Sequence, residues 1–273
     1  MKNILLPTDF SSFSRAALQT VLEIFAGKDV NLTLLHVYHL KSLEDCADPE
    51  EQKRQEESLR ISAELKIAEE AHRASQRIRG KVDTIVKWGF ASEEVLAHTQ
   101  TGNFDLLVMG THGASTMREK VFGSNTANLL EKTTLPTLVV PESAVQKLYF
   151  RKLVFATTLK DKPETLETLR LFCENIHPSC EWLHILEDDQ TPKQIKEQFH
   201  QLTKDWKSNV ILAIRNAPNP VEGIQRFVQD EKPDLLAMVI HERTIWEMIF
   251  NESLTRQIAY QPKVPMLVIH EKK

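Results

Sequence analysis

The sequence predicts an α/β protein made of two tandem doubly wound parallel-sheet domains. Three observations carry this prediction: short apolar runs bounded by turn residues, helical stretches between those runs, and a second half that repeats the order of the first. Apolar runs that are too short for helices are typical of strands buried on both faces, which is the setting of parallel strands. Strands that alternate with helices fold into a doubly wound sheet with right-handed crossovers.

The first half contains four such apolar runs, each bounded by turn residues. They are Ile4–Leu6, Leu32–Val37, Leu106–Met109 and Leu138–Val140. We expect each of these runs to form a strand.

The stretches between these runs carry apolar residues at helical spacing. The first is Phe13–Phe25, whose apolar face consists of Ala16, Ala17, Val21, Ile24 and Phe25. The second is Glu50–Arg79, whose single apolar stripe consists of Leu59, Ala63, Ile67, Ala71, Ala74 and Ile78. A single stripe predicts a helix that covers one face of a sheet and exposes its charged side to solvent. Ser92–Thr99 and Ser124–Lys132 complete the expected helices.

Segments of the two halves match in the same order along the chain. The matched pairs are Asn3–Asp9 with Lys152–Thr158, Leu34–Val37 with Trp182–Ile185, Asp105–Met109 with Asp234–Met238, and Leu135–Val140 with Val264–Ile269. One match arises easily by chance, but four in series indicate two copies of one domain. We place the domains at residues 1–144 and 145–273, with a short boundary segment at 141–146. A short tether favours domains packed on each other.

Composition and charge exclude several classes of protein. The 273 residues carry 34 Lys and Arg against 38 Asp and Glu, a net charge of −4, which argues against a nucleic-acid binder. No run approaches the roughly 18 apolar residues of a membrane span, and the first residues lack the apolar region of a signal peptide. Cys46, Cys173 and Cys180 form no C-x-x-C pair, and an odd, sparse count fits a reducing cytoplasm. We expect a cytoplasmic protein in which Cys173 and Cys180 are buried.

Polar and glycine-rich segments follow the expected strands, and ligands of open α/β sheets bind beyond the carboxyl ends of strands. The segment after Met109 has the pattern G-x2-G-x9-G-S. Its residues are Gly110, Gly113, Gly123 and Ser124, with Thr111 and His112 inside the pattern and Asn125 and Thr126 directly after it. Glycine lets a backbone approach a ligand closely, and the free N–H groups of a helix start suit phosphate. The pattern is neither a Walker A loop nor G-x-G-x-x-G.

These motifs resemble the universal stress protein family. The segments that carry the resemblance are P-T-D-F-S at 7–11, L-L-H-V at 34–37, G-T-H-G at 110–113, F-G-S-N-T at 122–126 and L-P-T-L-V-V at 135–140. The resemblance is strong over residues 1–142 and weaker over about 151–273, and tandem members are known in the family. It implies Rossmann-like domains of the adenine nucleotide alpha hydrolase-like type. In the family the last strand makes the dimer contact, so Thr137–Val140 and Met266–Ile269 are expected to pair within one chain as an intramolecular pseudo-dimer. Whether whole chains also form a homodimer stays open.

The resemblance also implies a binding site for ATP in the first half. In ATP-binding relatives, the residues that match Pro7, Thr8, Asp9 and Val37 line the adenine and ribose. The residues that match Gly110, Gly113, Gly123 and Ser124 surround the ribose and phosphates. Further candidates in the same segments are Met109, Thr111, His112, Asn125 and Thr126. Any Mg²⁺ would arrive with the nucleotide and be held mainly by its phosphates.

The second half departs from this pattern. Thr158 aligns with Asp9, Val239 with Gly110, Glu242 with Gly113, and Asn251-Glu252 with Gly123-Ser124; seven of the eight glycines lie in the first half. Carboxylates repel phosphates, and a β-branched residue blocks close backbone approach. We therefore expect one working site and one degenerate copy. The apolar cluster of Trp246, Met248, Ile249 and Phe250 is expected to fill the emptied pocket, and the alternative is that it faces a partner.

Some of these residues also have ordinary structural explanations. Asp9 precedes a helix and is a good N-cap candidate. His36 and His184 repeat at matching strand ends, where packing or hydrogen bonding is the commoner role. His112 is expected to be solvated rather than catalytic, and the remaining histidines show no metal-ligand spacing.

The function favoured by the sequence is a stress-response regulator that binds an adenine nucleotide. The second hypothesis is slow ATP hydrolysis or autophosphorylation, but the loop offers no clear Walker-B-like acid, so we assign no catalytic residue. The third is an interaction scaffold with a vestigial site. The partner protein, the stress, and the choice between ATP and AMP stay open.

Overall fold

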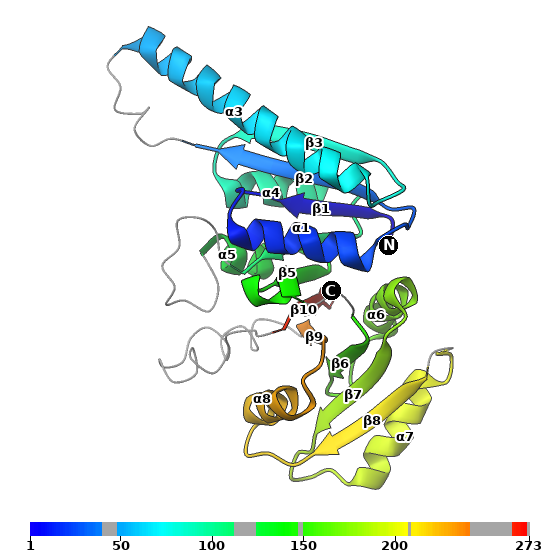
Figure 1. The fold of residues 1–273 in the computed structure, drawn as a ribbon. Helices are drawn as coiled ribbons and strands as arrows, with labels where there is room; N and C mark the ends of the chain where they lie inside the picture. Colours follow the sequence, from blue (N-terminus) through cyan, green and yellow to red (C-terminus); the bar gives the residue numbers. More distant parts are fainter. Residues whose placement is uncertain (40–47, 112–123, 147–149, 207–208, 241–263, 272–273) are drawn as a thin grey trace.

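The computed structural model describes residues 1–39, 48–111, 124–146, 150–206, 209–240 and 264–271 (Figure 1). The strands of the first half are β1 (Asn3–Pro7), β2 (Asn31–Tyr38), β3 (Val82–Trp88), β4 (Leu106–Gly110) and β5 (Thr137–Val140). Its helices are α1 (Ser12–Ile24), α3 (Pro49–Ser75), α4 (Ala91–Thr101) and α5 (Ser124–Lys132), and a 3-10 helix at Glu142–Gln146 follows β5. The strands of the second half are β6 (Lys152–Ala156), β7 (Ser179–Ile185), β8 (Val210–Arg215), β9 (Leu235–Ile240) and β10 (Met266–His270). Its helices are α6 (Pro163–Ile176), α7 (Pro192–Thr203) and α8 (Pro220–Glu231).

All these strands lie in one sheet, in the order β3-β2-β1-β4-β5-β10-β9-β6-β7-β8. Neighbouring strands are parallel except at the centre, where β5 and β10 pair antiparallel, with Leu138 opposite Leu267. The expected pairing of the two last strands is therefore confirmed. Because β5 and β10 pair with each other within one chain, these two strand edges are already occupied. A homodimer of whole chains would have to use another surface.

Helices cover both faces of this sheet and enclose two apolar cores. On one face, visible at the front of the upper half in Figure 1, α1 and α3 pack on the first-half strands, and α6 and α7 take the same place in the second half. On the other face, α4, α5 and α8 enclose the second core. The central residues of β1 and all residues of β4, β5 and β9 are buried, which explains the apolar runs in these strands.

The expected strands and helices are all present, with ends that differ by a few residues, but two strands, β3 and β8, were not predicted. β3 has no apolar run: its sequence VDTIVKW alternates, and its residues are only half-buried or exposed. It lies at one end of the sheet and pairs only with β2. An edge strand buries less of its surface than a central strand, so it contains fewer consecutive apolar residues. β3 therefore has no apolar run that would predict it.

The long helix α3 follows its predicted stripe only in part. Its buried residues are Ala63, Ile67, Glu70 and Ala74, all in its C-terminal half. The N-terminal half extends past the sheet (Figure 1), and Ile61 and Leu65 are exposed. The burial expected for Cys173 and Cys180 is confirmed.

None of the helices in the described part of the chain is long and apolar enough to cross a membrane.

Candidate functional site

The loop after β1 is built around the buried threonine Thr8. Its hydroxyl oxygen accepts a hydrogen bond from the Phe10 N–H at 3.2 Å and lies 3.3 Å from the Ser14 hydroxyl. Its N–H donates to the Leu35 carbonyl at 2.9 Å, which joins the loop to β2. Phe10 adopts a left-handed backbone conformation with φ of 61°. Such a conformation is unfavourable for a non-glycine residue, so the surrounding hydrogen bonds must hold it in place.

His36, near the end of β2, supports the same loop. Its Nδ1 lies 2.7 Å from the Thr8 carbonyl oxygen, and its ring packs on Phe10 with 4.4 Å between centroids. Burial lowers the pKa of His36, which favours the neutral ring. The hydrogen-bonding role expected for this histidine is confirmed.

Glu70 of α3 lies beneath the loop and was not identified from the sequence. Its carboxylate accepts a hydrogen bond from the Thr8 hydroxyl at 3.0 Å, and the residue is 2% exposed. Burial raises the pKa of the Glu70 carboxyl, and the hydrogen bond from Thr8 opposes that shift. The sequence did hold a signal, because Glu70 falls between Ile67 and Ala74 on the apolar stripe of a helix. A carboxylate on such a stripe needs a polar partner.

Asp9 is exposed at the tip of this loop. Its Oδ1 accepts a hydrogen bond from the Ser11 N–H at 3.1 Å, which forms a turn just before α1. The residue that caps α1 is Ser11, whose hydroxyl accepts from the Ser14 N–H at 3.2 Å. The N-cap alternative for Asp9 is therefore wrong, and its carboxylate stands at the carboxyl edge of the sheet.

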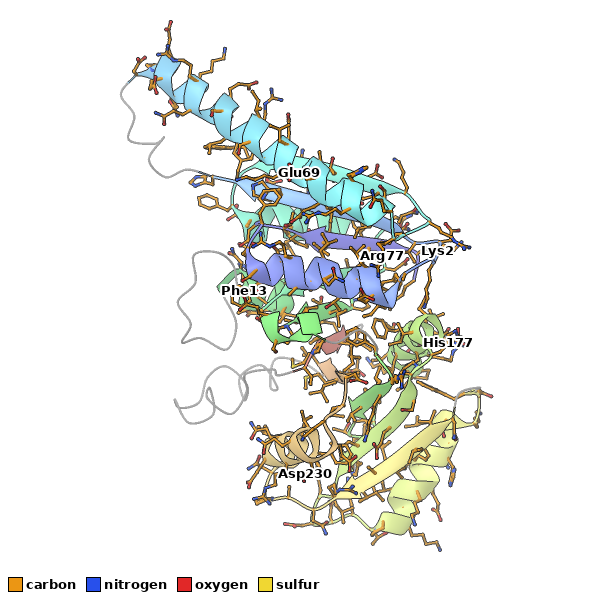
Figure 2. All side chains as sticks on the ribbon, in the orientation of Figure 1. Lys2, Phe13, Glu69, Arg77, His177 and Asp230 are labelled. Atoms are coloured by element: carbon orange, nitrogen blue, oxygen red, sulfur yellow. The ribbon has the colours of Figure 1, made fainter. Side chains whose placement is uncertain are left out.

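Gly110, the last residue of β4, lies against the start of α1. A Cβ at this position would come within 2.8 Å of the Phe13 carbonyl carbon and oxygen, so no side chain fits unless the backbone moves. Figure 2 labels Phe13 at the N-terminal end of α1. The Gly110 carbonyl accepts a hydrogen bond from the buried Thr126 hydroxyl at 3.0 Å, which ties α5 to β4. Close packing against α1 therefore requires a glycine at position 110, whether or not a ligand binds nearby.

The other described candidates lie at or near the same edge, where β1 lies between β2 and β4. The Thr111 N–H donates to the Val140 carbonyl at 3.1 Å, and Thr111 is buried. Met109 is also buried and packs in the core on the α4 and α5 side, with Val37 half-buried against that core. Pro7 is half-buried and Asn125 is exposed.

Part of the predicted glycine pattern lies outside the described residues. These residues of the pattern are His112, Gly113 and Gly123. In the second half, the Trp246–Phe250 cluster and the positions Glu242, Asn251 and Glu252 also lie outside the described residues. The two ends of the pattern are described: Gly110 ends β4, and α5 begins at Ser124 as predicted. In sequence, the pattern therefore runs from the last residue of β4 to the first residue of α5.

The loop after β6 in the second half repeats the backbone of the Thr8 loop. The Thr157 N–H donates to the Leu183 carbonyl, His184 Nδ1 lies 3.0 Å from the Thr157 carbonyl oxygen, and Leu159 has φ of 61°. Here the threonine hydroxyl donates to Asp161 of the same loop instead of to a helix. Strand registers place Val239 where the first half has Gly110. The alignment made from the sequence is thus supported by equivalent hydrogen bonds.

Among the described residues, no group of three or more His, Cys, Asp or Glu side chains could hold a metal ion. The candidate site offers one exposed carboxylate, Asp9, and backbone groups at the ends of three parallel strands. Such a set can receive a polar ligand.

Comparisons with known proteins agree on one family. The sequence model of the universal stress protein family matches residues 1–141. Universal stress protein MJ0577 of Methanocaldococcus jannaschii is 28% identical over 152 residues, which cover 51% of this chain and 94% of that protein. Universal stress protein Slr1230 of Synechocystis is 35% identical over 68 residues, 25% of this chain and 24% of its own length.

A comparison of folds extends over both halves. The crystal structure of a universal stress protein from Archaeoglobus fulgidus is similar with a TM-score of 0.74 and 18% identity, and covers 99% of this chain and 98% of its own. At that identity the similarity shows the fold alone. It includes the second half, which the family model leaves unmatched.

Proposed function

Because the chain belongs to the universal stress protein family, we propose that it binds an adenine nucleotide, ATP in the first place, at the carboxyl edge of β1, β2 and β4. We propose further that residues 1–144 form the nucleotide-binding domain and residues 145–273 a degenerate copy. In this proposal, ATP binding shifts the conformation or the partner interactions of a stress-response regulator. Such a shift requires that two states of the protein differ in their affinity for ATP.

The observation that carries the proposal is the placement of the glycine pattern. It starts at Gly110, at the end of β4, which is the sheet neighbour of β1, and it ends at Ser124, the first residue of α5. The crevice beyond the carboxyl ends of strands is where open α/β sheets receive ligands, and a helix start suits phosphate. In this arrangement the phosphates would lie toward Gly110 and Ser124. The adenine and ribose would lie toward Asp9 and Val37.

The exposed carboxylate of Asp9 fits the sugar or base end of such a ligand. It would accept hydrogen bonds from hydroxyl or amino groups, whereas phosphates would be repelled. Mg²⁺, if bound, would be held mainly by the phosphates.

The first experiment is to identify the nucleotide that the purified protein carries. The protein is denatured, and released nucleotides are identified by mass spectrometry and counted per chain. We expect close to one adenine nucleotide per chain, and none in a Gly113→Glu variant that copies Glu242. Protein that is empty and also takes up no added ATP would contradict the proposal. Released ADP would point to hydrolysis.

A sharper variant is Asp9→Thr, which copies the second half. There the Thr158 hydroxyl accepts a hydrogen bond from the Lys160 N–H at 3.4 Å, so a threonine can form the same turn without a carboxylate. We expect affinity for ATP to fall about tenfold, or about 1.4 kcal/mol, with little change in thermal stability. The matched control is Thr158→Asp, which should leave ATP affinity unchanged. Equal affinity in the Asp9→Thr variant would remove Asp9 from the site.

A further inference from the structure

The second half contains a hollow of about 560 Å³ between α7 and the edge strand β8. Its apolar lining includes Phe199 of α7, Leu212 and Ile214 of β8, and Leu186, which follows β7. We call it the α7 hollow. It lies at the carboxyl ends of β7 and β8, and its volume falls within the roughly 300–1,000 Å³ of small-molecule sites.

The equivalent place in the first half carries aromatic side chains. The strand registers equate Leu186 with Tyr38 and Asn216 with Trp88. The rings of Tyr38 and Trp88 lie 5.3 Å apart, and the ring of His39 lies 5.3 Å from that of Trp88. The first half thus has contacting aromatic rings where the second half has Leu186 and Asn216.

Three polar side chains line the α7 hollow. Lys196 and His200 lie one turn apart on α7, and Asn216 follows β8. All three are exposed at the rim of the hollow, and among the residues that the structure describes none of their side chains has a hydrogen-bond or ion-pair partner. By contrast, Lys152 of the same half contacts two carboxylates, Glu181 at 3.1 Å and Glu231 at 2.6 Å.

The charge of the lining has one sign. No carboxylate is among the described residues that line the hollow. The acidic run 187–189 begins directly after Leu186, but none of its three residues lines the hollow. A permanent positive charge beside apolar walls favours an anion with an apolar body.

We propose that the α7 hollow is a binding site for an amphipathic organic anion with a compact apolar body and a single negative charge. The apolar body packs on Phe199, Leu212 and Ile214. The anionic group lies at Lys196 and His200, and the Asn216 amide completes its hydrogen bonds. This site is independent of the nucleotide proposed for the first half.

The test uses a fluorescent aromatic sulfonate, 8-anilinonaphthalene-1-sulfonate, titrated into the full-length protein. Its neutral analogue N-phenyl-1-naphthylamine has a similar ring system without the charge. We expect one sulfonate per chain, bound at least fivefold more tightly than the neutral probe. Equal affinity for the two probes would overturn the proposed preference for an anion.

Two charge variants test the place of binding. Lys196→Glu should weaken sulfonate binding about tenfold and change binding of the neutral probe less than twofold. The matched control is Lys193→Glu, an exposed position of the same helix outside the lining, which should change neither. Equal losses in the two variants would mean that overall charge attracts the probe, and would overturn the site.

A filling variant tests the hollow itself. Leu186→Tyr combined with Asn216→Trp introduces the rings of the first half, and both probes should then lose measurable binding. Retained sulfonate binding in a folded filled variant would overturn the proposal. If the filled variant does not fold, the comparison of Lys196→Glu with Lys193→Glu decides. Displacement of the sulfonate by ATP would assign the probe to the nucleotide site and overturn the proposal as well.

Discussion

The loops after β1 and β6 follow the same backbone path with different chemistry. In both, a buried threonine bonds the neighbouring strand, a histidine ring nitrogen lies against the threonine carbonyl, and the second residue after the threonine is left-handed. They differ at the exposed tip, where the first half has Asp9 and the second Thr158. The hydrogen bonds that hold the loop are therefore kept even where the side chain proposed to contact a ligand differs.

The two loops also differ in the carboxylate that holds the threonine. In the first half Glu70 reaches the loop from α3, so the loop is tied to a helix far along the chain. In the second half Asp161 lies within the loop itself. The first loop therefore depends on long-range packing, and the second forms its contact locally.

The largest effect is expected from Gly110→Val, which copies Val239. The new side chain would collide with the Phe13 backbone, and we expect a loss of about 3 kcal/mol in the free energy of unfolding, together with loss of ATP binding. Urea unfolding and ATP titration measure the two effects. The reverse change, Val239→Gly, should cost about 2 kcal/mol by lost burial and should create no ATP binding. A fully stable Gly110→Val protein would mean that the two halves are interchangeable here.

The next largest effect is expected at His270, the last residue of β10. Burial lowers the pKa of His270 to about 4, and its Nε2 has no hydrogen-bond partner among the described residues. The strand registers place Pro141 at the equivalent position of the first half.

Because the folded pKa of His270 lies below the ordinary 6.5, its contribution to stability is complete above pH 6.5 and is lost as the pH falls toward 4. We expect about 2 to 3 kcal/mol of acid-dependent loss from this residue. His270→Leu should remove that part of the pH dependence, as measured by urea unfolding at pH 4.5 and 7.5. An unchanged pH profile in the variant would assign the acid sensitivity to other groups.

A smaller effect is expected where the first half has aromatic rings and the second has the α7 hollow. Trp88→Asn copies Asn216 and removes ring contacts with Tyr38 and His39. Because Trp88 is 38% exposed, we expect a loss of only about 1 to 2 kcal/mol in thermal or urea unfolding. The control Ile211→Asn, at an exposed position of β8, should cost less than about 0.5 kcal/mol.

The smallest effect concerns the carboxylate under the Thr8 loop. Burial raises the folded pKa of Glu70 above its ordinary 4.5, so its favourable contribution is complete below pH 4.5 and is lost as the pH rises through the raised value. Glu70→Gln stays neutral, and we expect it to be about 1 kcal/mol less stable than wild type at low pH, with a smaller deficit at pH 8.

Urea unfolding across the pH range measures this deficit. The control Glu69→Gln, on the exposed side of the same helix, should shift stability by less than about 0.5 kcal/mol at every pH. A deficit for Glu70→Gln that grows with pH would contradict the assigned direction of the shift.

The sequence predicted those elements whose stability comes from burial on both faces. β1, β4 and β5 contain short apolar runs because helices cover them on either side, and these runs are visible in the sequence alone. β3 was missed because half of its surface faces solvent. The start of α5 at Ser124 was predicted because a glycine–serine pair precedes a helical pattern.

The sequence predicted those residues of the candidate site that directly follow a strand. Thr8, Asp9 and Gly110 were found because they follow strands, yet the role of Asp9 in the turn and the packing of Gly110 on Phe13 needed coordinates. Glu70 is distant from Thr8 in sequence, so only the fold brings the two together. The α7 hollow is a space between side chains of α7 and β8, which are separate in sequence, so no local sequence pattern predicts it.

The position of β10 has a consequence for synthesis of the protein. Thr137–Val140 is fully buried, but its partner strand, Met266–His270, is made about 130 residues later. At about 5–20 residues per second, the first half waits on the order of ten seconds with an unpaired apolar edge, which is a template for contact with other nascent chains. Chaperones that shield strand edges should therefore matter more for this chain than for its first half made alone and free to dimerise through β5. A stop codon just before Met266 should turn a folding intermediate into an aggregating product.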